Sequence, residues 1–324
     1  MSRVATWFSS SLFRSLLLGS AALWISGCIT LSPADFRTFE QYGEPTGQFR
    51  DTPLASGQIV VSGSASHMDI ALALIPADFS PYVHMGILVI EDGIPYVYEE
   101  LGDPSLNLDP EVPPTSTIEG AVTRTRLEKF ARRYYYVEIY EPANADRDKV
   151  ADFARYHYAA KTPFDKYFDY SDDSAFYCSE FVARALEAGG SSALSPTPNR
   201  PNRSVSVLMD WLQTPETTLD AQRMIDSSQP VMLISNRSKT EILALNEIKR
   251  ELHRRFTSDQ MLGNLFRWDL SRPILRHPVH SFVSRSLFRA GRMEPADQDQ
   301  VAALIRQAAD ELLGKFESCH LTYC

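Results

Sequence analysis

The chain has 324 residues, enough for one large domain or two modest ones. Hydrophobic residues make up 44% of it, which is ordinary for a globular protein, and beyond the amino terminus no stretch is long and apolar enough to cross a bilayer. The formal net charge of −9 argues against a nucleic-acid-binding protein, because contact with phosphates needs a basic surface.

The amino terminus has the pattern of a secretory signal. Arg3 and Arg14 precede a short apolar segment, residues 16–25, which is followed by small residues and Cys28. The sequence Ile-Ser-Gly-Cys at residues 25–28 resembles a bacterial lipobox, which implies removal of residues 1–27 and lipidation of Cys28. An ordinary secretory signal and an uncleaved anchor are the alternatives. By resemblance to enterobacterial sorting, Ile29 in place of Asp favours a lipid anchor in the outer membrane, with the protein facing the periplasm.

Residues 28–54 are turn-rich and are predicted to form a tether, and a strand is predicted at residues 57–62. A β-hairpin follows. Residues 84–90 form an apolar strand, Asp92-Gly93 is a preferred two-residue turn, and residues 95–99 form the returning strand.

This hairpin places an acidic residue beside His84. If the turn has two residues, residue 91 pairs with 94, so His84 and Glu99 lie on one face as diagonal neighbours. A three-residue turn would exchange the faces and bring Glu100 to that place. A carboxylate beside an imidazole fixes its tautomer and raises its basicity. Glu99 is therefore the predicted partner of His84, and Glu100 is the alternative.

Cys178 is predicted to open a helix. A first helix, residues 146–158 with Asp146 as its cap, precedes an aromatic loop at residues 162–170, and the second helix then runs from Cys178 to the Gly189-Gly190 pair. A thiol in the first helical turn lies at the positive end of the helix dipole, which favours the nucleophilic thiolate. A buried structural cysteine is the alternative. Pattern and spacing alone do not bring Cys178 to His84, which lies 94 residues earlier.

Two other sets of residues near these segments have less specific interpretations. Glu180, one turn inside the helix, is expected to be structural, either as a cap or as a partner of an arginine. Five aromatic residues could line an apolar cleft, but packing in the core is the preferred interpretation for most of them. They are Tyr82, Phe164, Tyr167, Phe168 and Tyr177.

The part of the chain after a proline-rich boundary near residue 200 is predicted to be mainly helical. Apolar stripes at helical spacing occur over residues 242–256 and 301–316. The basic stretch at residues 249–292 is best explained as a solvated face, with anionic phosphates as a weaker alternative. Cys319 and Cys324 could form a disulfide in an oxidising periplasm. No Cys/His spacing is typical of a zinc site, and no metal or cofactor is expected.

Four segments occur in a suggestive order along residues 55–190. They are His84-Met85-Gly86-Ile87, then Val97-Tyr98-Glu99, then Pro163-Phe164-Asp165 with the residues up to 169, and Tyr177-Cys178-Ser179-Glu180. Together they resemble the YiiX/YaeF-like group of circularly permuted papain-like amidases within the NlpC superfamily. In that group the histidine strand precedes the cysteine helix, the reverse of the ordinary papain order.

The resemblance implies an α+β, circularly permuted papain-like fold, with an antiparallel sheet packed on helices. Residues 55–200 would form the cysteine hydrolase domain and residues 201–324 a helical extension. The family roles would be carried by Cys178 as nucleophile, His84 as base and Glu99 as orienting residue. The expected activity is cleavage of amide or ester bonds through a thioester, for example in cell-wall peptides.

Two further functions are alternatives to a peptide-directed hydrolase. One is a lipid-directed acyl hydrolase or acyltransferase, and the other is a non-catalytic binding protein that retains the fold. The predicted partners are therefore a peptide or a lipid-like acyl substrate, together with the membrane through the lipid anchor. The sequence does not predict an oligomeric state.

Overall fold

The computed structural model describes residues 37–39, 54–102, 120–165, 168–199, 217–235, 237–258, 265–269, 272–293 and 297–317. The chain divides into two compact units, Met1–Asp35 and Phe36–Cys324, and every described residue lies in the second. The predicted signal, Cys28, nearly all of the tether, and the pair Cys319 and Cys324 lie outside the described residues, so the statements about them stay predictions.

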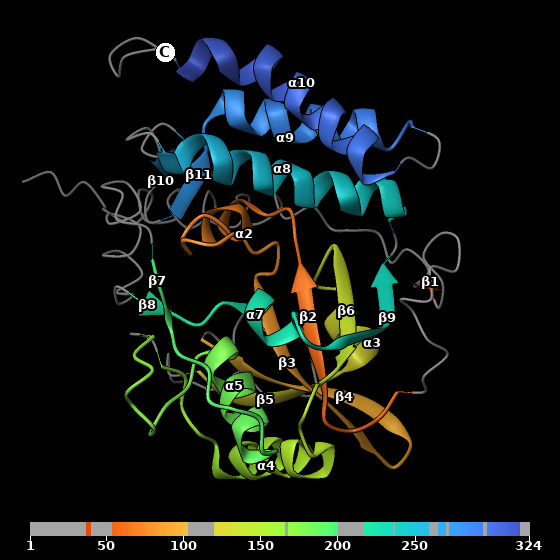
Figure 1. Ribbon diagram of the computed structural model, residues 1–324, viewed down its shortest axis with the longest axis vertical. Helices are drawn as coiled ribbons and strands as arrows, with labels where there is room; N and C mark the ends of the chain where they lie inside the picture. Colours follow the sequence, from red (N-terminus) through yellow and green to blue (C-terminus); the bar gives the residue numbers. More distant parts are fainter. Residues whose placement is uncertain are drawn as a thin grey trace, which may run out of the picture. The chain divides into compact units, whose positions relative to one another are not determined.

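The second unit is an α+β structure built on an antiparallel sheet (Figure 1). Seven described strands follow the order β1-β9-β6-β2-β3-β4-β5, and every neighbouring pair is antiparallel. The strands are β1 (Arg37–Phe39), β2 (Gln58–Gly63), β3 (His84–Glu91), β4 (Ile94–Leu101), β5 (Ala121–Arg126), β6 (Tyr136–Glu141) and β9 (Gln229–Ser235). The α+β class and the antiparallel sheet predicted from the sequence are confirmed.

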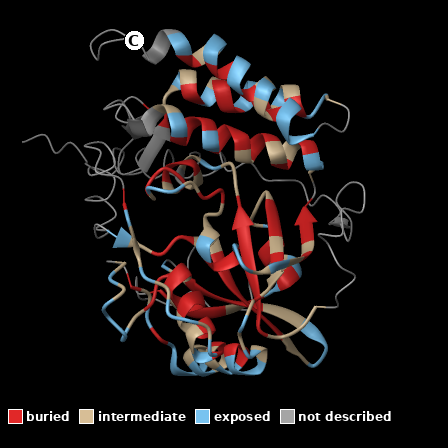
Figure 2. Cartoon of the chain, viewed as in Figure 1, coloured by how far each residue is buried: buried red, intermediate tan, exposed pale blue. Residues whose placement is uncertain are grey.

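The sheet is covered on both faces, because successive side chains of a strand point to opposite sides. On one face, Ile59, Met85 and Ile87 belong to a core cluster shared with α4 (Arg147–Ala160) and α5 (Cys178–Ala188). On the other face, Val60, Leu88 and Val97 pack with residues of the short helix α3 (Leu127–Ala131). Figure 2 shows the central strands as almost continuously buried.

The β3–β4 hairpin has the predicted two-residue turn. Glu91 pairs with Ile94, and both turn residues have positive φ angles, 50° at Asp92 and 78° at Gly93. Glycine adopts this conformation without strain, and aspartate tolerates it better than most residues. The register of the hairpin, and with it the face on which each side chain lies, therefore follows from the Asp-Gly pair.

The two helices on the first face begin and end close to their predicted positions. Asp146 caps α4, since its side chain accepts hydrogen bonds from the backbone N–H groups of Asp148 and Lys149. Helix α5 begins at Cys178 and has Gly189 as its C-terminal cap. The two helices contact each other, and α5 also packs on β3 and β4. Cys178 is thereby held against the strands that carry His84 and the glutamates.

The part of the chain after residue 200 supplies a strand to the sheet as well as helices. Strand β9 lies between β1 and β6. Helices α8 (Lys239–Ser258), α9 (His277–Ala290) and α10 (Gln298–Glu317) stack on one another, as Figure 1 shows. They share a core cluster with Ile70 and Leu74, from α2 (His67–Leu72) and the residues after it.

The remaining described elements are short. They are β7 (Thr197–Pro198), β8 (Thr217–Thr218), α7 (Ala221–Ile225), β10 (Phe266–Asp269) and β11 (Arg272–Leu275). Strand β7 pairs with β8, and β10 pairs with β11. Among the described helices, none combines the length and apolar character needed to span a bilayer.

Candidate active site

His84 is the first residue of β3, and its imidazole lies between a carboxylate and a pair of aromatic rings. Its Nε2 atom is 2.8 Å from Oε2 of Glu99. The ring stacks on Tyr134, with a centroid separation of 5.9 Å and an interplanar angle of 15°, and also packs on Phe130. These contacts fix the plane of the imidazole. The structure thus has the predicted pairing of His84 with Glu99, and not the alternative pairing with Glu100.

Glu99 is fully buried, and its charge is balanced by a residue that the sequence did not suggest. The guanidinium of Arg133 donates to Oε1 of Glu99, while Oε2 faces His84. Burial alone would raise the pKa of Glu99, but the charge of Arg133 and the contacts with His84 outweigh it and lower the pKa below its usual value. The carboxylate is therefore charged, and its two oxygens join Arg133 to the imidazole.

Cys178 meets the imidazole from α5. It is a free thiol, partly exposed, that lines the same pocket as His84 and lies close enough to raise the pKa of that imidazole. Since Nε2 faces Glu99, Nδ1 is the ring nitrogen that is left for the sulfur. Burial would lower the pKa of His84, but its hydrogen bonds to Cys178 and Glu99 and the charges of these groups raise the pKa to about 9. The imidazole beside the thiol is therefore protonated at neutral pH.

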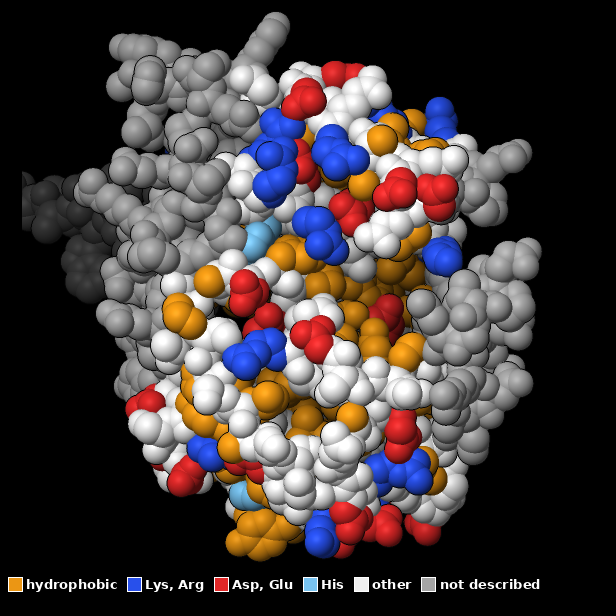
Figure 3. Space-filling view, in the orientation of Figure 1, with side chains coloured by type: hydrophobic (Ala, Val, Ile, Leu, Met, Phe, Trp, Pro, Cys, Tyr) orange, Lys and Arg blue, Asp and Glu red, His pale blue; other side chains and the backbone are white. Residues whose placement is uncertain are grey.

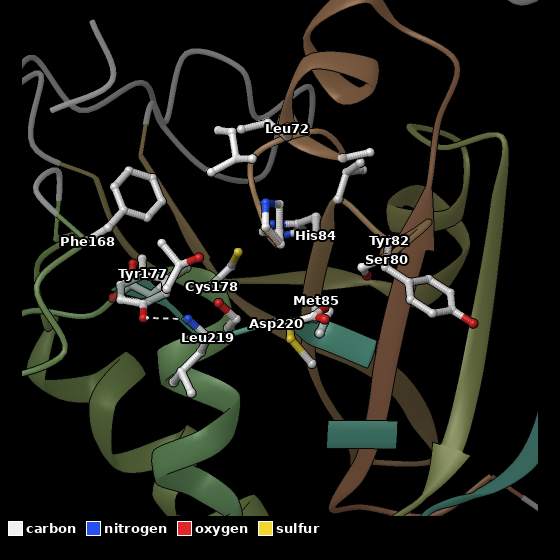
Figure 4. Close-up of a pocket in the computed structure, with 18 of the residues that line it drawn as sticks. Leu72, Ser80, Tyr82, His84, Met85, Phe168, Tyr177, Cys178, Leu219 and Asp220 are labelled. Carbon is white, nitrogen blue, oxygen red and sulfur yellow. Dashed lines mark hydrogen bonds between the residues drawn. The ribbon is translucent and has the colours of Figure 1, made fainter. Parts of the chain in front are cut away.

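Cys178 and His84 line one pocket, with a volume of about 340 Å³ (Figure 4). Apolar side chains form most of its wall, among them Leu72, Ile75, Val83, Met85, Leu101 and Leu219. Of the five aromatic residues considered above, Tyr82, Phe164, Phe168 and Tyr177 line the pocket, and Tyr167 lies outside the described residues. These four also lie in or pack against the core cluster beneath the sheet, so both interpretations hold for them.

Residues after position 200 also contribute to this pocket. Thr218, Leu219, Asp220 and Ala221 line it, and the backbone N–H of Leu219 donates to the Tyr177 hydroxyl at 3.2 Å. This part of the wall was not predicted, because the segment carries no chemical motif. The wall that faces Cys178 is thus completed by a part of the chain that the resemblance does not cover.

Helix α8 holds the loop that leads into His84. Lys249, which is fully buried, donates from Nζ to the carbonyl oxygen of Pro81 at 2.8 Å, and His253 contacts the carbonyl oxygen of Pro76 through Nε2 at 3.1 Å. Pro76, like Ser80, Tyr82 and Val83 of the same loop, lines the pocket. The sequence contained a signal for this role, since a lysine at residue 249 interrupts the apolar stripe of a helix.

Glu180 has the structural environment that was expected. Its Oε1 atom is 3.5 Å from Nε of Arg184, one turn further along α5. Burial raises the pKa of Glu180 to about 8, and the charge of Arg184 opposes that shift only in part. In the described residues, no group of three or more His, Cys, Asp or Glu side chains is arranged to hold a metal ion.

Comparison with known proteins gives little beyond this geometry. No family model matches the chain, and no curated protein matches it. A solved structure described as metalloprotein yiiX from Escherichia coli O157:H7 aligns with 21% sequence identity and a TM-score of 0.42, over 55% of this chain and 95% of that one. This similarity is too weak to assign a function.

Proposed function

We propose that the chain is a cysteine hydrolase that cleaves amide or ester bonds through a thioester on Cys178. The proposal rests mainly on one observation. His84 lies between the Cys178 thiol and the buried Glu99 carboxylate, with its ring held by aromatic stacking. A nucleophile, a base in contact with it and a group that orients the base are the components of nucleophilic catalysis.

We further infer a circularly permuted papain-like arrangement, as the resemblance implied. In its favour, the strand that carries the histidine precedes the helix that opens with the cysteine, and that helix packs against the same strand.

The reaction begins from the thiolate–imidazolium pair. The sulfur attacks the carbonyl carbon of the substrate, an S–C bond forms, and the electron pair of the carbonyl double bond moves to oxygen. The backbone N–H of Cys178, at the start of α5, is placed to stabilise this oxyanion. When the intermediate collapses, the C–N or C–O bond breaks and His84 gives its proton to the leaving group.

Hydrolysis of the thioester restores the enzyme. Neutral His84 takes a proton from water while the water oxygen attacks the thioester carbon. The C–S bond breaks, the carboxylic acid product leaves, and the thiolate–imidazolium pair forms again. Throughout both steps Glu99 stays charged and keeps the imidazole in the orientation that presents Nδ1 to the sulfur.

The wall of the pocket favours an apolar acyl group over a polar peptide. Most of the side chains around Cys178 are aliphatic or aromatic, and such a surface gains free energy by covering hydrocarbon. This observation supports a second candidate function, a lipid-like acyl hydrolase or acyltransferase, beside a hydrolase of cell-wall peptides. A binding protein without catalysis would use the same pocket but would form no covalent intermediate.

Trapping of the acyl-enzyme tests the proposal and separates the substrate classes. A soluble form lacking residues 1–28 is mixed with p-nitrophenyl esters of short and medium acyl chains, or with N-acyl peptide p-nitroanilides, and quenched in acid. We expect a mass adduct that maps to Cys178, disappears in Cys178→Ala and forms more slowly in His84→Ala. Absence of an adduct with every probe, or an adduct formed equally fast in His84→Ala, would contradict a hydrolase of this type.

We also propose that a lipid on Cys28 anchors the chain to the outer membrane, facing the periplasm. The support is the lipobox-like sequence at residues 25–28 and Ile29 after it. Fractionation of cells that express the wild type or Cys28→Ala tests this. The wild type should sediment with outer membranes, and the variant should no longer be found in that fraction. A variant that still sediments with them would point to an uncleaved anchor instead.

A further inference from the structure

Glu100 is a buried acid in the pocket that the proposed mechanism leaves unused. It follows Glu99 in β4, so its side chain points to the opposite face of the sheet, the face covered by α5. It is 1% exposed and lines the pocket together with Cys178. No side chain among the described residues hydrogen-bonds with either of its carboxyl oxygens, and the backbone N–H of Leu101 is the one donor that acts on them.

The surroundings of Glu100 favour the neutral acid. Burial has the largest effect on the pKa of Glu100, and the charges of Cys178 and, to a smaller extent, Glu180 raise it further. The backbone N–H of Leu101 lowers the pKa but offsets these effects only in part. The result is a pKa of about 10. An ionised carboxylate buried without a partner would be costly, whereas a protonated carboxyl carries an O–H donor. At neutral pH this donor lies in the same cavity as the nucleophile.

We propose that Glu100 is a further catalytic residue, whose protonated carboxyl group donates a hydrogen bond to the carbonyl oxygen of the substrate bound at Cys178. The proposal rests on the proposed function. It joins two observations, a carboxyl group buried without a side-chain partner and its position on the wall of the pocket that holds the nucleophile. The substrate oxygen supplies the missing hydrogen-bond partner. Glu100 keeps its proton throughout, so no bond at Glu100 breaks.

Two neighbouring acids show why this role belongs to Glu100. Asp220 also lines the pocket, but its carboxylate caps α7, accepting from the backbone N–H of Gln222 at 2.8 Å. Glu180 is as deeply buried as Glu100, but it lies beside Arg184 and does not line the pocket. Glu100 combines burial, an unmade hydrogen bond and access to the substrate space.

The first test compares acylation of Cys178 in variants of Glu100, with p-nitrophenyl butyrate as the probe. In Glu100→Leu the hydrogen-bond donor is lost, so we expect acylation to slow by about a hundredfold. In Glu100→Gln an amide N–H₂ group replaces the acid as a neutral donor, so we expect a rate within about tenfold of the wild type. Glu180→Gln is the matched control and should acylate at the wild-type rate. Circular dichroism spectra confirm that each variant is folded.

The outcomes separate this inference from the proposed function. Acylation in Glu100→Leu that is as fast as in the wild type overturns the role of Glu100 and leaves the hydrolase intact. A wild type in which Cys178 is not acylated overturns the proposed function and the role of Glu100 with it. If Glu100→Gln is as slow as Glu100→Leu, the proposed donor is not what the reaction uses, and the inference also fails.

The second test measures the protonation state of Glu100 without any substrate. At pH 7 the infrared spectrum of the wild type should contain a carbonyl band of a buried, protonated carboxylic acid that is lost in Glu100→Gln. Glu180→Gln shows which part of that spectral region belongs to the other buried acid. If Glu100→Gln and the wild type have the same spectrum in that region, Glu100 is ionised and donates no hydrogen bond, which overturns the inference.

Discussion

At the scale of single residues, the site depends on how one buried carboxylate is shared. Glu99 contacts Arg133 with one oxygen and His84 with the other. A carboxylate with two cationic or polarisable partners stays charged even when it is fully buried. This explains why burial, which would make both Glu99 and His84 neutral, does not decide the charge of either one.

Replacing Glu99 tests that arrangement. Glu99→Gln removes the charge that neutralises the largely buried Arg133, so we expect the free energy of unfolding to fall by about 3 kcal/mol, measured by urea denaturation at pH 7. The pKa of His84, measured by NMR, should fall as well, because a contribution that raises it is lost. The control is Glu128→Gln, which removes an exposed ion pair with Arg132 and should change stability by less than about 1 kcal/mol. Equal effects of the two substitutions would contradict the account.

The sequence predicted part of this site. The Asp92-Gly93 turn fixed the face of Glu99, because a two-residue loop has a defined register. Arg133 lies between α3 and β6, and no motif or spacing in the sequence connected it with Glu99. The meeting of His84 and Cys178 depends on how α5 packs on β3, and it was inferred only from resemblance to a family.

At the scale of elements, α8 controls the loop before β3. The ammonium of Lys249 holds the Pro81 carbonyl three residues before His84. Because this lysine is fully buried, its pKa is lowered to about 8. Its position links a helix of the carboxy-terminal part to the loop that leads into His84.

Lys249→Met tests the link through the pH dependence of stability. A lowered lysine pKa means that between about pH 8 and 10.5 the unfolded chain binds a proton that the folded chain lacks. Lys249 therefore makes stability rise with pH in that window, by up to about 1.4 kcal/mol per pH unit. We expect this rise to be lost in Lys249→Met and kept in Lys239→Met, an exposed lysine of the same helix. Parallel stability curves of wild type and Lys249→Met would show that this lysine is not buried as described.

The elements that agree best with their predictions are those whose ends are marked in the sequence by a capping residue. Helix α4 has the predicted Asp146 cap, and α5 begins at Cys178 and ends at Ala188, with Gly189 as its cap. Strand β9 is not among the predicted elements, although residues 231–234 form a short apolar run after Pro230, which is compatible with a strand. Its pairing partners, β1 and β6, are distant in sequence, and local patterns do not reveal such partners.

At the scale of the whole described unit, the sequence suggested a catalytic domain ending near residue 200. The later part nevertheless contributes β9 to the sheet, residues 218–221 to the pocket wall, and α8 to α10 to a core shared with Ile70. The basic stretch in this part is extensively paired with acids: Arg250 with Glu247, Arg254 and Arg255 with Glu251, and Arg289 with Glu311. Figure 3 shows positive and negative side chains interspersed in the region of these helices, as expected for a solvated face.

Truncation measures how far the two parts depend on each other. A chain that ends at residue 200 would lose β9 and expose Ile70 and Leu74, which are fully buried in the intact chain. We expect this chain to lose its cooperative thermal unfolding and to bind a hydrophobic dye. If the truncated chain unfolds cooperatively and its Cys178 keeps the reactivity of the full chain, the first 200 residues form an independent domain.

The proposed function requires that His84 activates the thiol of Cys178. The most direct measurement is the rate at which iodoacetamide alkylates Cys178, mapped by peptide mass spectrometry, as a function of pH in wild type and His84→Ala. Since the pKa of His84 is about 9, its positive charge is present at neutral pH and is lost as the pH rises through 9. We predict that at pH 7 the wild type reacts about tenfold faster or more, and that the difference disappears above pH 9. Superimposable profiles of the two proteins would show that the imidazole does not activate the thiol, and would contradict the account.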